Sequence, residues 1–318
     1  MTGTRAPVPA TGAGPAQLAA HVARHYNLGS PGSSTTLTTG YEDCNIDLQA
    51  SRARVVVKVF SPQRAALAAR TVRLIASAQA AGVRHPRLHH DSAGNLVHRY
   101  AGHQLIVMDF DPGRSLYDLR RPPSPAELAA VITQAARIHA IDEHPDFVFD
   151  PWAITNIGPM AAETSRHVSP RLRRLVGQAV TKTARIDRTA LPSALIHADL
   201  TKGNVLIGAD GQATILDFAV ANRLPRVQEL AVIAANLTHG APDPVPARAD
   251  AIAASYSASV PVPLSRAEHK ALHAFSLAAT AMELLGALRE WHNGNHSPET
   301  EYLISLGTAG LSDYLTAT

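Results

Sequence analysis

The sequence predicts an α+β fold with two lobes, a small β-rich N-terminal lobe and a larger, mainly helical C-terminal lobe. Strand-like segments rich in β-branched residues dominate up to residue 108, with one helix inserted among them. Helix-start signals dominate beyond residue 113. The chain has 318 residues, of which 46% are hydrophobic, and this is enough for one bilobal domain with a substantial core.

The N-terminal lobe is expected over residues 17–108, after a Pro-, Gly- and Ala-rich segment at residues 1–16 that is typical of a disordered tail. Ser61 and Pro62 are expected to start the inserted helix as its N-cap and first helical residue, and Gly82 to end it. The expected elements, in chain order, are a helix at 17–26, strands at 35–39, 46–50 and 55–60, a helix at 62–81, and a hairpin of strands at 96–100 and 104–108.

Residues 109–113, Asp-Phe-Asp-Pro-Gly, are interpreted as a hinge, and residues 114–318 as the helical C-terminal lobe. Helix starts are expected in that lobe at Ser169-Pro170 and at two capping boxes, Ser124 to Glu127 and Ser265 to Glu268.

The composition predicts a cytoplasmic protein with no membrane partner. Cys44 is the only cysteine, which excludes an intrachain disulfide and favours a reducing compartment. Residues 1–15 lack the apolar core of a signal peptide. The longest apolar stretch, 271–288, is interrupted by polar residues such as Ser276 and Glu283, a pattern that favours a buried helix over a membrane span. Both a monomer and a homodimer are compatible with these features.

Positive charge is concentrated between Asp47 and Asp91, where eight Arg or Lys residues and no acid occur. A basic stretch raises the question of nucleic-acid binding. This one contains a single aromatic residue, Phe60, and no nucleic-acid-binding motif, so no nucleic-acid partner is expected. A positive field near nucleotide phosphates explains the stretch equally well.

The most informative segment is 195–207, Leu-Ile-His-Ala-Asp-Leu-Thr-Lys-Gly-Asn-Val-Leu-Ile. In it Asn204 follows Asp199 with four residues between, and Asp217 stands at the end of the next hairpin strand. Phosphoryl transfer needs a carboxylate that orients the attacking hydroxyl, and an amide and a second carboxylate that hold Mg²⁺ on the phosphates. Asp199, Asn204 and Asp217 supply this set, and a turn-capping role for Asp199 is the structural alternative.

At these residues the chain resembles the aminoglycoside phosphotransferase and choline-kinase-like family of the protein-kinase-like fold. That family typically carries His-Gly-Asp-x4-Asn followed by Asp-Phe or Asp-Trp, and the resemblance extends over roughly residues 35–235. It implies phosphorylation of a hydroxyl group on a small molecule, with ATP, or alternatively GTP, and Mg²⁺ as cofactors. Asp199 is then the catalytic base, and Asn204 and Asp217 are the metal ligands.

Two further residues of the segment have roles that the resemblance implies less directly. His197 occupies a position that buttresses the loop by hydrogen bonding in the family. Lys202 departs from the family, which often has His-Pro-Gly where this chain has Thr201-Lys202-Gly203. Its ammonium is predicted either to stabilise the transferring phosphoryl group or to be a solvated loop lysine.

Lys58 is the candidate nucleotide-binding lysine, because it stands alone in the apolar strand Val55 to Phe60 and an unpaired buried ammonium is unfavourable. A solvent-facing strand position is the alternative. The loop at 40–45 lacks a G-x-G-x-x-G motif, but Asn45 or backbone amides there are candidates for phosphate contact. The segment from Met108 to Phe110 is expected to meet the adenine.

Kinase-like proteins usually pair this lysine with a glutamate on the following helix, and the helix at 62–81 contains no acid. Asp217 is the favoured replacement. We expect the lysine to form no buried ion pair in the absence of nucleotide, so that its removal leaves the protein's stability little changed. The other candidate partners are Thr71, Gln79, Glu42 and Asp43.

The substrate is expected to lie among helices after the catalytic loop. Glu229 is in a Glu-Leu-Ala segment similar to the Asp-Leu-Ala of the family, with a structural acid at a helix start as the alternative. The remaining candidates are the consecutive residues Glu290, Trp291 and His292. Five histidines between residues 85 and 103 match no structural zinc spacing and have no cysteine partner, so surface or hairpin positions are expected for them.

The predicted function is an ATP-dependent O-phosphotransferase acting on a hydroxylated natural product or antibiotic. A metabolic kinase for a homoserine- or amino-alcohol-like compound is the alternative within the same class. A nucleotide-binding pseudokinase is a different class, which the intact Asp199, Asn204 and Asp217 disfavour and the missing helix glutamate favours. A protein kinase is disfavoured because no Ala-Pro-Glu-like segment follows Asp217.

Overall fold

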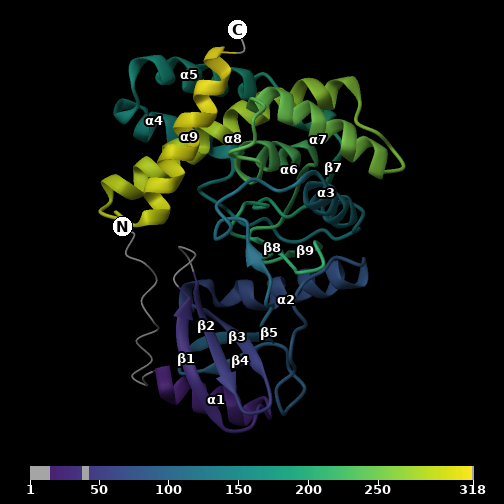
Figure 1. Cartoon of the computed structure of the whole chain (residues 1–318), viewed down its shortest axis with the longest axis vertical. Coiled ribbons are helices and arrows are strands. Elements are labelled where there is room, and N and C mark those ends of the chain that lie inside the picture. The colour runs from purple at the N-terminus through teal and green to yellow at the C-terminus, as the bar shows by residue number, and fades with distance from the viewer. Residues whose placement is uncertain (1–14, 38–42, 317–318) are drawn as a thin grey trace.

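A computed structural model describes residues 15–37 and 43–316. Residues 1–14 of the tail predicted over 1–16, and part of the loop before Asn45, including Glu42, lie outside the described residues. The last two residues of that predicted tail, Pro15 and Ala16, are helical instead. Two lobes are stacked along the long axis of the molecule, the N-lobe rich in strands and the C-lobe mainly helical (Figure 1). The predicted α+β bilobal fold is therefore confirmed.

The N-lobe is built on an antiparallel sheet with strand order β1-β2-β3-β5-β4. A helix precedes the sheet in sequence, and a short 3-10 turn at Pro62–Arg64 leads into the helix inserted after β3. The bounds are α1 Pro15–His25, β1 Pro31–Leu37, β2 Cys44–Ala50, β3 Arg54–Phe60, α2 Ala65–Ala80, β4 His98–Tyr100 and β5 His103–Asp109.

The two faces of the sheet pack against different helices. Val55, Val57 and Val59 of β3 join the apolar face of α1 in one buried cluster. The alternate residue Phe60 joins the main core, which also contains α2, and Val56 packs against it. Because side chains alternate across a strand, Lys58 lies on the α2 side, the side that faces the C-lobe in Figure 1.

The C-lobe begins with β6, which pairs with a hairpin formed by β8 and β9, while β7 pairs with β10. Helices cover these short strands (Figure 1). The bounds are β6 Arg114–Ser115, α3 Pro125–His139, α4 Ile157–Thr164, α5 Pro170–Ala184, β7 Ser193–Ile196, β8 Val205–Ile207, β9 Ala213–Ile215, β10 Asn222–Pro225, α6 Val227–Val232, a π-helical turn Ile233–Leu237, α7 Val245–Ser259, α8 Arg266–His292 and α9 Pro298–Thr316.

The capping boxes predicted at Ser124 and Ser265 are both formed, since each serine accepts a hydrogen bond from the backbone N–H of a glutamate that in turn bonds the serine's own N–H. At Ser61 and Ser169 the helix starts are confirmed, but neither side chain makes the expected cap hydrogen bond. In both places a proline follows directly, and its fixed φ favours the helical turn without a side-chain cap.

Helix α8 contains the apolar stretch recognised in the sequence. By length and composition it is long and apolar enough to cross a membrane, but 83% of its most apolar window is buried inside the protein. It packs against α4, α5, α6, α7 and α9 (Figure 1). This burial is the property of a central core helix, as the sequence predicted for residues 271–288.

Candidate active site

The segment 197–204 is a loop between β7 and β8, at the face of the C-lobe that meets the N-lobe. The imidazole of His197 is fully buried and fastens this loop to the neighbouring strand end. Its Nδ1 accepts a hydrogen bond from the backbone N–H of Asp199 at 3.2 Å, so its Nε2 carries the proton and donates to the carbonyl of Leu216 at 2.7 Å. Burial lowers the pKa of His197 to about 4, which keeps the ring neutral. This geometry favours the buttressing role.

Two non-glycine residues of the site have left-handed backbone conformations. Ala198 has φ of 71° and Asp217 has φ of 59°. A left-handed conformation costs an L-residue with a Cβ roughly 1–2 kcal/mol. Ala198 stands where the resembled family carries glycine, so the rest of the loop must hold it in place.

Glu229 at the start of α6 supplies part of that restraint. Its carboxylate accepts hydrogen bonds from the backbone N–H groups of His197 and Ala198. The side chain is fully buried, and burial raises the pKa of Glu229 to about 7, against the opposing effect of these N–H donors. The prediction that Glu229 contacts substrate is therefore wrong, and its alternative, a structural acid, is correct. The reason is that the Glu229 carboxylate contacts the backbone of the loop and is not among the residues that line the cavity.

The side chains of Asp199, Asn204 and Asp217 come together on the side of the loop that lines the cavity between the lobes. The side-chain amide of Asn204 donates to the Asp199 carboxylate at 2.6 Å and to the Asp199 carbonyl at 3.0 Å. Burial, together with the charges of Asp150, Asp217 and Glu283, raises the pKa of Asp199 well above its usual value. Such a concentration of half-buried carboxylates favours a bound cation.

Lys58 reaches this group from the N-lobe. Its ammonium lies 2.7 Å from Asp217 and 3.3 Å from Asp43, and Arg64 also pairs with Asp43 at 3.0 Å. Burial acts to lower the pKa of Lys58, but the two carboxylates outweigh burial and raise it. Burial likewise acts to raise the pKa of Asp217, and the charge of Lys58 holds it below its usual value.

These contacts show which residues pair with Lys58 in place of the missing helix glutamate. Asp217 is the partner that the sequence analysis favoured, and Asp43, one of the other candidates, is the second. The expectation that Lys58 forms no buried ion pair without nucleotide is wrong, because both carboxylates belong to the protein and Lys58 is only 4% exposed. Asp43 comes from the segment before β2, so the usual helix position is replaced by a strand-entry position.

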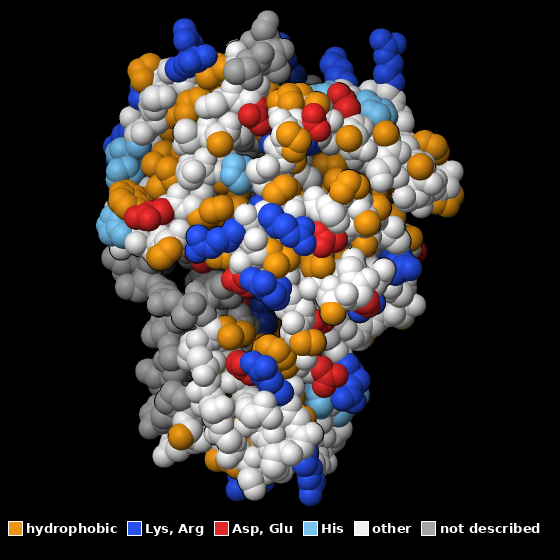
Figure 2. All heavy atoms as spheres, viewed as in Figure 1, with side chains coloured by type: hydrophobic (Ala, Val, Ile, Leu, Met, Phe, Trp, Pro, Cys, Tyr) orange, Lys and Arg blue, Asp and Glu red, His pale blue; other side chains and the backbone are white. Residues whose placement is uncertain are grey.

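A cavity of about 640 Å³ lies between the lobes and is lined by Lys58, Asp199, Asn204 and Asp217, among other residues. In Figure 2, basic and acidic side chains lie side by side at the waist where the lobes meet. The N-lobe side of the cavity is largely apolar and includes Val56, Ile106 and Met108. Asn45 also lines it, directly opposite Lys58 in the β2–β3 ladder.

The segment 108–110 borders the apolar part of the cavity. Met108 belongs to β5 and is paired with Val56 across the sheet. Phe110 follows the strand end, its backbone N–H donates to the carbonyl of Arg54 at 3.1 Å, and its ring lies 3.5 Å from the Arg54 guanidinium carbon. The positions predicted to meet adenine are thus held rigidly at the cavity wall.

Lys202 has a different environment from the one predicted for a catalytic lysine. Its ammonium donates to the backbone carbonyls of Arg121 at 3.1 Å and His239 at 2.7 Å, and the residue is 4% exposed. Burial, with the charges of Arg248 and Arg121, lowers the pKa of Lys202 to about 8. Lys202 lines the cavity, but its burial contradicts the alternative of a solvated loop lysine. The ammonium ties the loop to two other segments, which favours a structural role.

Glu290, Trp291 and His292 at the end of α8 do not line the cavity. Glu290 pairs with Arg289, the ring of Trp291 contacts His296, and the ring of His292 stacks on His167. The prediction that these residues bind substrate is wrong, because the cavity meets α8 about two turns earlier. Other side chains of the C-lobe line the same cavity as Asp199, namely Asp150, Trp152, Glu283, Glu299 and Tyr302.

Sequence reasoning missed this second group of residues. Glu283 had a signal, since it is an acid in the middle of an otherwise apolar helix, and burial raises its pKa to about 7. Asn236 donates to it at 2.9 Å. Asp150 and Trp152 lie in an irregular segment before α4, where no periodic pattern marks them.

Comparison with known proteins agrees with this geometry. The sequence model of the APH phosphotransferase enzyme family matches residues 34–272. A homoserine kinase of Rhodopseudomonas palustris is 25% identical over 198 residues, which are 61% of this chain and 60% of that protein. A homoserine kinase of Pseudomonas aeruginosa is 35% identical over 120 residues, 35% of this chain and 37% of that protein. The chain thus matches less than two thirds of the length of these relatives.

Solved structures share the fold across nearly the whole chain. A spectinomycin phosphotransferase in complex with ADP and spectinomycin superposes with a TM-score of 0.66 at 13% identity, covering 93% of this chain and 98% of that one. The choline kinase of Streptococcus pneumoniae gives 0.62 at 12% identity, covering 92% and 97%. An aminoglycoside phosphotransferase of Alicyclobacillus acidocaldarius gives 0.62 at 15% identity, covering 89% and 92%. At these identities the likeness concerns the fold, and the predicted protein-kinase-like fold is confirmed.

Proposed function

The chain belongs to the phosphotransferase enzyme family and is a small-molecule kinase, and from this premise we propose that it transfers the γ-phosphoryl group of ATP to a hydroxyl group of its substrate. The observation that carries the proposal is the convergence of Lys58, Asp199, Asn204 and Asp217 on one cavity between the lobes. These are the residue types that phosphoryl transfer requires for positioning and for charge stabilisation.

Asp199 is proposed as the catalytic base. Its carboxylate orients the substrate hydroxyl and accepts the proton as the oxygen–phosphorus bond forms and the bond to the leaving diphosphate breaks. The hydrogen bond from Asn204 fixes the rotamer of this carboxylate. The raised pKa of Asp199 reflects burial first and then the negative charge of the neighbouring carboxylates, and bound cations counteract the effect of that charge.

The residues present fit Mg²⁺. Asp217 offers carboxylate oxygens and Asn204 an amide oxygen, the hard ligands that this ion prefers. The ion, when bound, neutralises charge on the phosphates. Because the amide nitrogen of Asn204 already donates to Asp199, the amide oxygen is the atom left for a metal.

The nucleotide is proposed to lie along the N-lobe wall of the cavity. Lys58 is directed at the phosphates, Asn45 opposite it provides a second polar group, and the segment 108–110 meets the adenine. Residues 17–108 then form the nucleotide-binding lobe, 109–113 the hinge and 114–318 the catalytic lobe. The spectinomycin phosphotransferase that shares the fold was solved with ADP, which supports an adenine nucleotide over GTP.

The substrate is proposed to carry a positively charged amino group as well as a hydroxyl. Asp150, Glu283 and Glu299 line the C-lobe side of the cavity around Asp199. Burial raises the pKa of both Asp150 and Glu283, and the charge of a bound cation would oppose this effect. Trp152 and Tyr302 add aromatic surface, which suits a cationic or ring-bearing ligand.

Two substrate classes satisfy this description. An aminated natural product or antibiotic fits a cavity of this size and remains the leading proposal. A hydroxy amino acid or amino alcohol is the second candidate, because the sequence relatives of the chain are homoserine kinases. A pseudokinase is disfavoured by the ion pairs of Lys58, since Asp43 fills the place of the missing glutamate.

The test is a panel of hydroxylated compounds with and without amino groups, incubated with ATP, Mg²⁺ and the protein. The panel includes spectinomycin and other aminated antibiotics, homoserine, choline and ethanolamine. Mass spectrometry detects the gain of a phosphate. We expect product only from amine-bearing compounds, and product from neutral alcohols alone would contradict the proposed substrate class.

Glu283→Gln then locates the substrate. We expect this change to raise KM for the accepted compound by at least about tenfold, because a charge-assisted contact to an amine is lost. Glu290→Gln on the same helix is the matched control and should leave KM unchanged. Equal effects of the two changes would remove Glu283 from the substrate site.

A further inference from the structure

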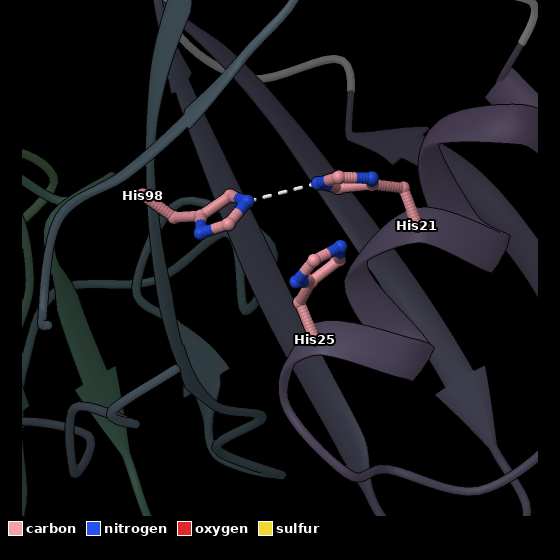
Figure 3. A group of neighbouring side chains, drawn as sticks. All are labelled: His21, His25 and His98. Carbon is pink, nitrogen blue, oxygen red and sulfur yellow. Dashed lines mark hydrogen bonds between the residues drawn. The ribbon is translucent and has the colours of Figure 1, made fainter. Parts of the chain in front are cut away.

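Three histidines meet at the far side of the N-lobe, away from the cavity. His21 and His25 are one turn apart on α1, and His98 is on β4 (Figure 3). One ring nitrogen of each lies within 4.8 Å of the others, and Nε2 of His21 is 2.8 Å from Nε2 of His98. Figure 1 places α1 at the end of the N-lobe opposite the C-lobe, so this cluster is separate from the site already described.

The histidine on β4 is oriented by a carboxylate. Nδ1 of His98 lies 2.9 Å from Asp91, so Nδ1 carries the proton and Nε2 presents its lone pair to His21 and His25. Asp91 is itself fixed, because its carboxylate accepts the backbone N–H groups of Ala93 at 3.0 Å and Asn95 at 2.8 Å. A carboxylate behind a ligating histidine is the usual support of a protein metal ligand.

We propose that His21, His25 and His98 bind a divalent transition-metal ion of the Zn²⁺ class, with Asp91 as the supporting carboxylate. Imidazole ligands select zinc, cobalt, nickel or copper ions over Mg²⁺ and Ca²⁺. In a tetrahedral site with metal–nitrogen bonds of about 2.0–2.1 Å, ligand nitrogens are about 3.3 Å apart. The two Nε2 atoms at 2.8 Å reach this separation by a small rotation of either ring. Three protein ligands leave a fourth position for water.

The ion would join segments far apart in the chain. His21 and His98 are separated by 77 positions, and α1 otherwise contacts the sheet through apolar side chains such as Leu18 and Val22. The backbone of the Asp91 turn already touches the end of α1, since the N–H of Ser92 donates to the carbonyl of His25. Metal binding is therefore expected to stabilise the N-lobe by holding α1 on its sheet.

One neighbouring group opposes the ion. The guanidinium of Arg24, an exposed residue, lies 3.3 Å from Nε2 of His25. It must turn into solvent when a cation binds, because like charges repel. Arg24→Ala is thus expected to tighten Zn²⁺ binding, a gain that an accidental histidine contact would not produce.

The experiment is isothermal titration of the full chain, without an affinity tag, with Zn²⁺ in excess Mg²⁺ to occupy the carboxylate site of the cavity. We expect a single high-affinity Zn²⁺ per chain. Affinity should fall by at least about tenfold in His21→Ala, His25→Ala and His98→Ala, and by roughly 10–100-fold in Asp91→Asn. His90→Ala, which removes an exposed histidine of the same lobe, is the matched control and should bind as wild type.

A second readout keeps the test decisive if a variant folds poorly. The Co²⁺-loaded protein should show the visible absorption of a tetrahedral ion, and Zn²⁺ should raise the unfolding temperature of wild type but not of His25→Ala, whose ring is the most peripheral to the Asp91 contact. Absence of a stoichiometric site in wild type, or Zn²⁺ affinity unaltered in all three histidine variants, would overturn the proposal.

Discussion

Two of the four lysines in this chain, Lys58 and Lys202, are buried. Their hydrogen-bond partners differ, and the difference distinguishes a lysine suited to phosphate contact from one that supports the loop. Lys58 is held by the carboxylates of Asp43 and Asp217. Lys202 is held by the carbonyls of Arg121 and His239. Both residues are only 4% exposed.

The difference shows in the direction of the pKa shift. Carboxylates neutralise an ammonium, so the pKa of Lys58 is raised in spite of burial. Carbonyls provide hydrogen bonds but no charge, so burial lowers the pKa of Lys202 to about 8. A charged ammonium beside Asp217, a proposed metal ligand, suits phosphate contact, whereas an ammonium bound to backbone carbonyls suits loop anchoring. Burial of a lysine in a kinase-like cleft therefore does not by itself mark it as catalytic.

Lys58→Ala is expected to have the largest effect on stability. Removal of the ammonium takes the buried cation away from Asp217 and leaves Asp43 with Arg64 alone, and breaking a buried ion pair lowers the free energy of unfolding by about 3–5 kcal/mol. Denaturant unfolding without nucleotide measures this directly. Lys270→Ala, which alters an exposed lysine, is the control. An unfolding free energy close to that of wild type would mean that the Asp43 and Asp217 contacts are not formed in solution.

Lys202→Met is expected to be milder and to act on stability rather than on chemistry. The change leaves two carbonyls without their donor, at about 1–3 kcal/mol, while the methionine fills the same space. We expect kcat to remain within about threefold of wild type below the unfolding temperature. The opposite pattern, unchanged stability with a large loss of kcat, would support the catalytic alternative, in which Lys202 contacts the transferring phosphoryl group.

Glu229→Gln tests the carboxylate that supports the backbone of His197 and Ala198, and the measurement is the pH dependence of stability. The folded-state pKa of Glu229, about 7, is above its ordinary value of 4.5, so folding takes up a proton between these pH values. The stability that protonation contributes is present below pH 4.5 and is lost as the pH rises towards 7. Wild type should therefore lose stability relative to Glu229→Gln across this range, by up to about 1.4 kcal/mol per pH unit. Parallel curves for the two proteins would contradict the burial of an uncompensated carboxylate at this position.

Features that depend on local sequence could be predicted. The spacing of Asp199, Asn204 and Asp217 is carried by a single loop and hairpin, so their convergence follows from chain geometry. The Lys58 prediction rested on a lone lysine in an otherwise apolar strand, and the buried position of Lys58 in β3 agrees with it. Both capping boxes were recognisable from four residues each.

Features that depend on contacts between distant segments could not be predicted. The sequence shows that Glu229 starts a helix, but only the fold places that helix behind the catalytic loop. The end of α8 was chosen because the resembled family places its substrate among helices after the catalytic loop, whereas the cavity lies beside the apolar middle of the helix, at Glu283. The cluster of His98 with two other histidines was not predicted, because His21 lies 77 positions earlier, on a helix that also carries His25.

The central claim is that Asp199 performs the chemistry of an ATP-dependent transfer to a substrate hydroxyl, and Asp199→Asn tests it most directly. The compound accepted most readily in the panel is used to measure kcat for wild type, for this variant and for Asp142→Asn, which alters an acid whose side chain is 91% exposed. We predict that Asp199→Asn lowers kcat by at least about 100-fold, with ATP affinity and unfolding temperature little changed, and that the control behaves as wild type. A kcat for Asp199→Asn within about threefold of wild type would contradict the account.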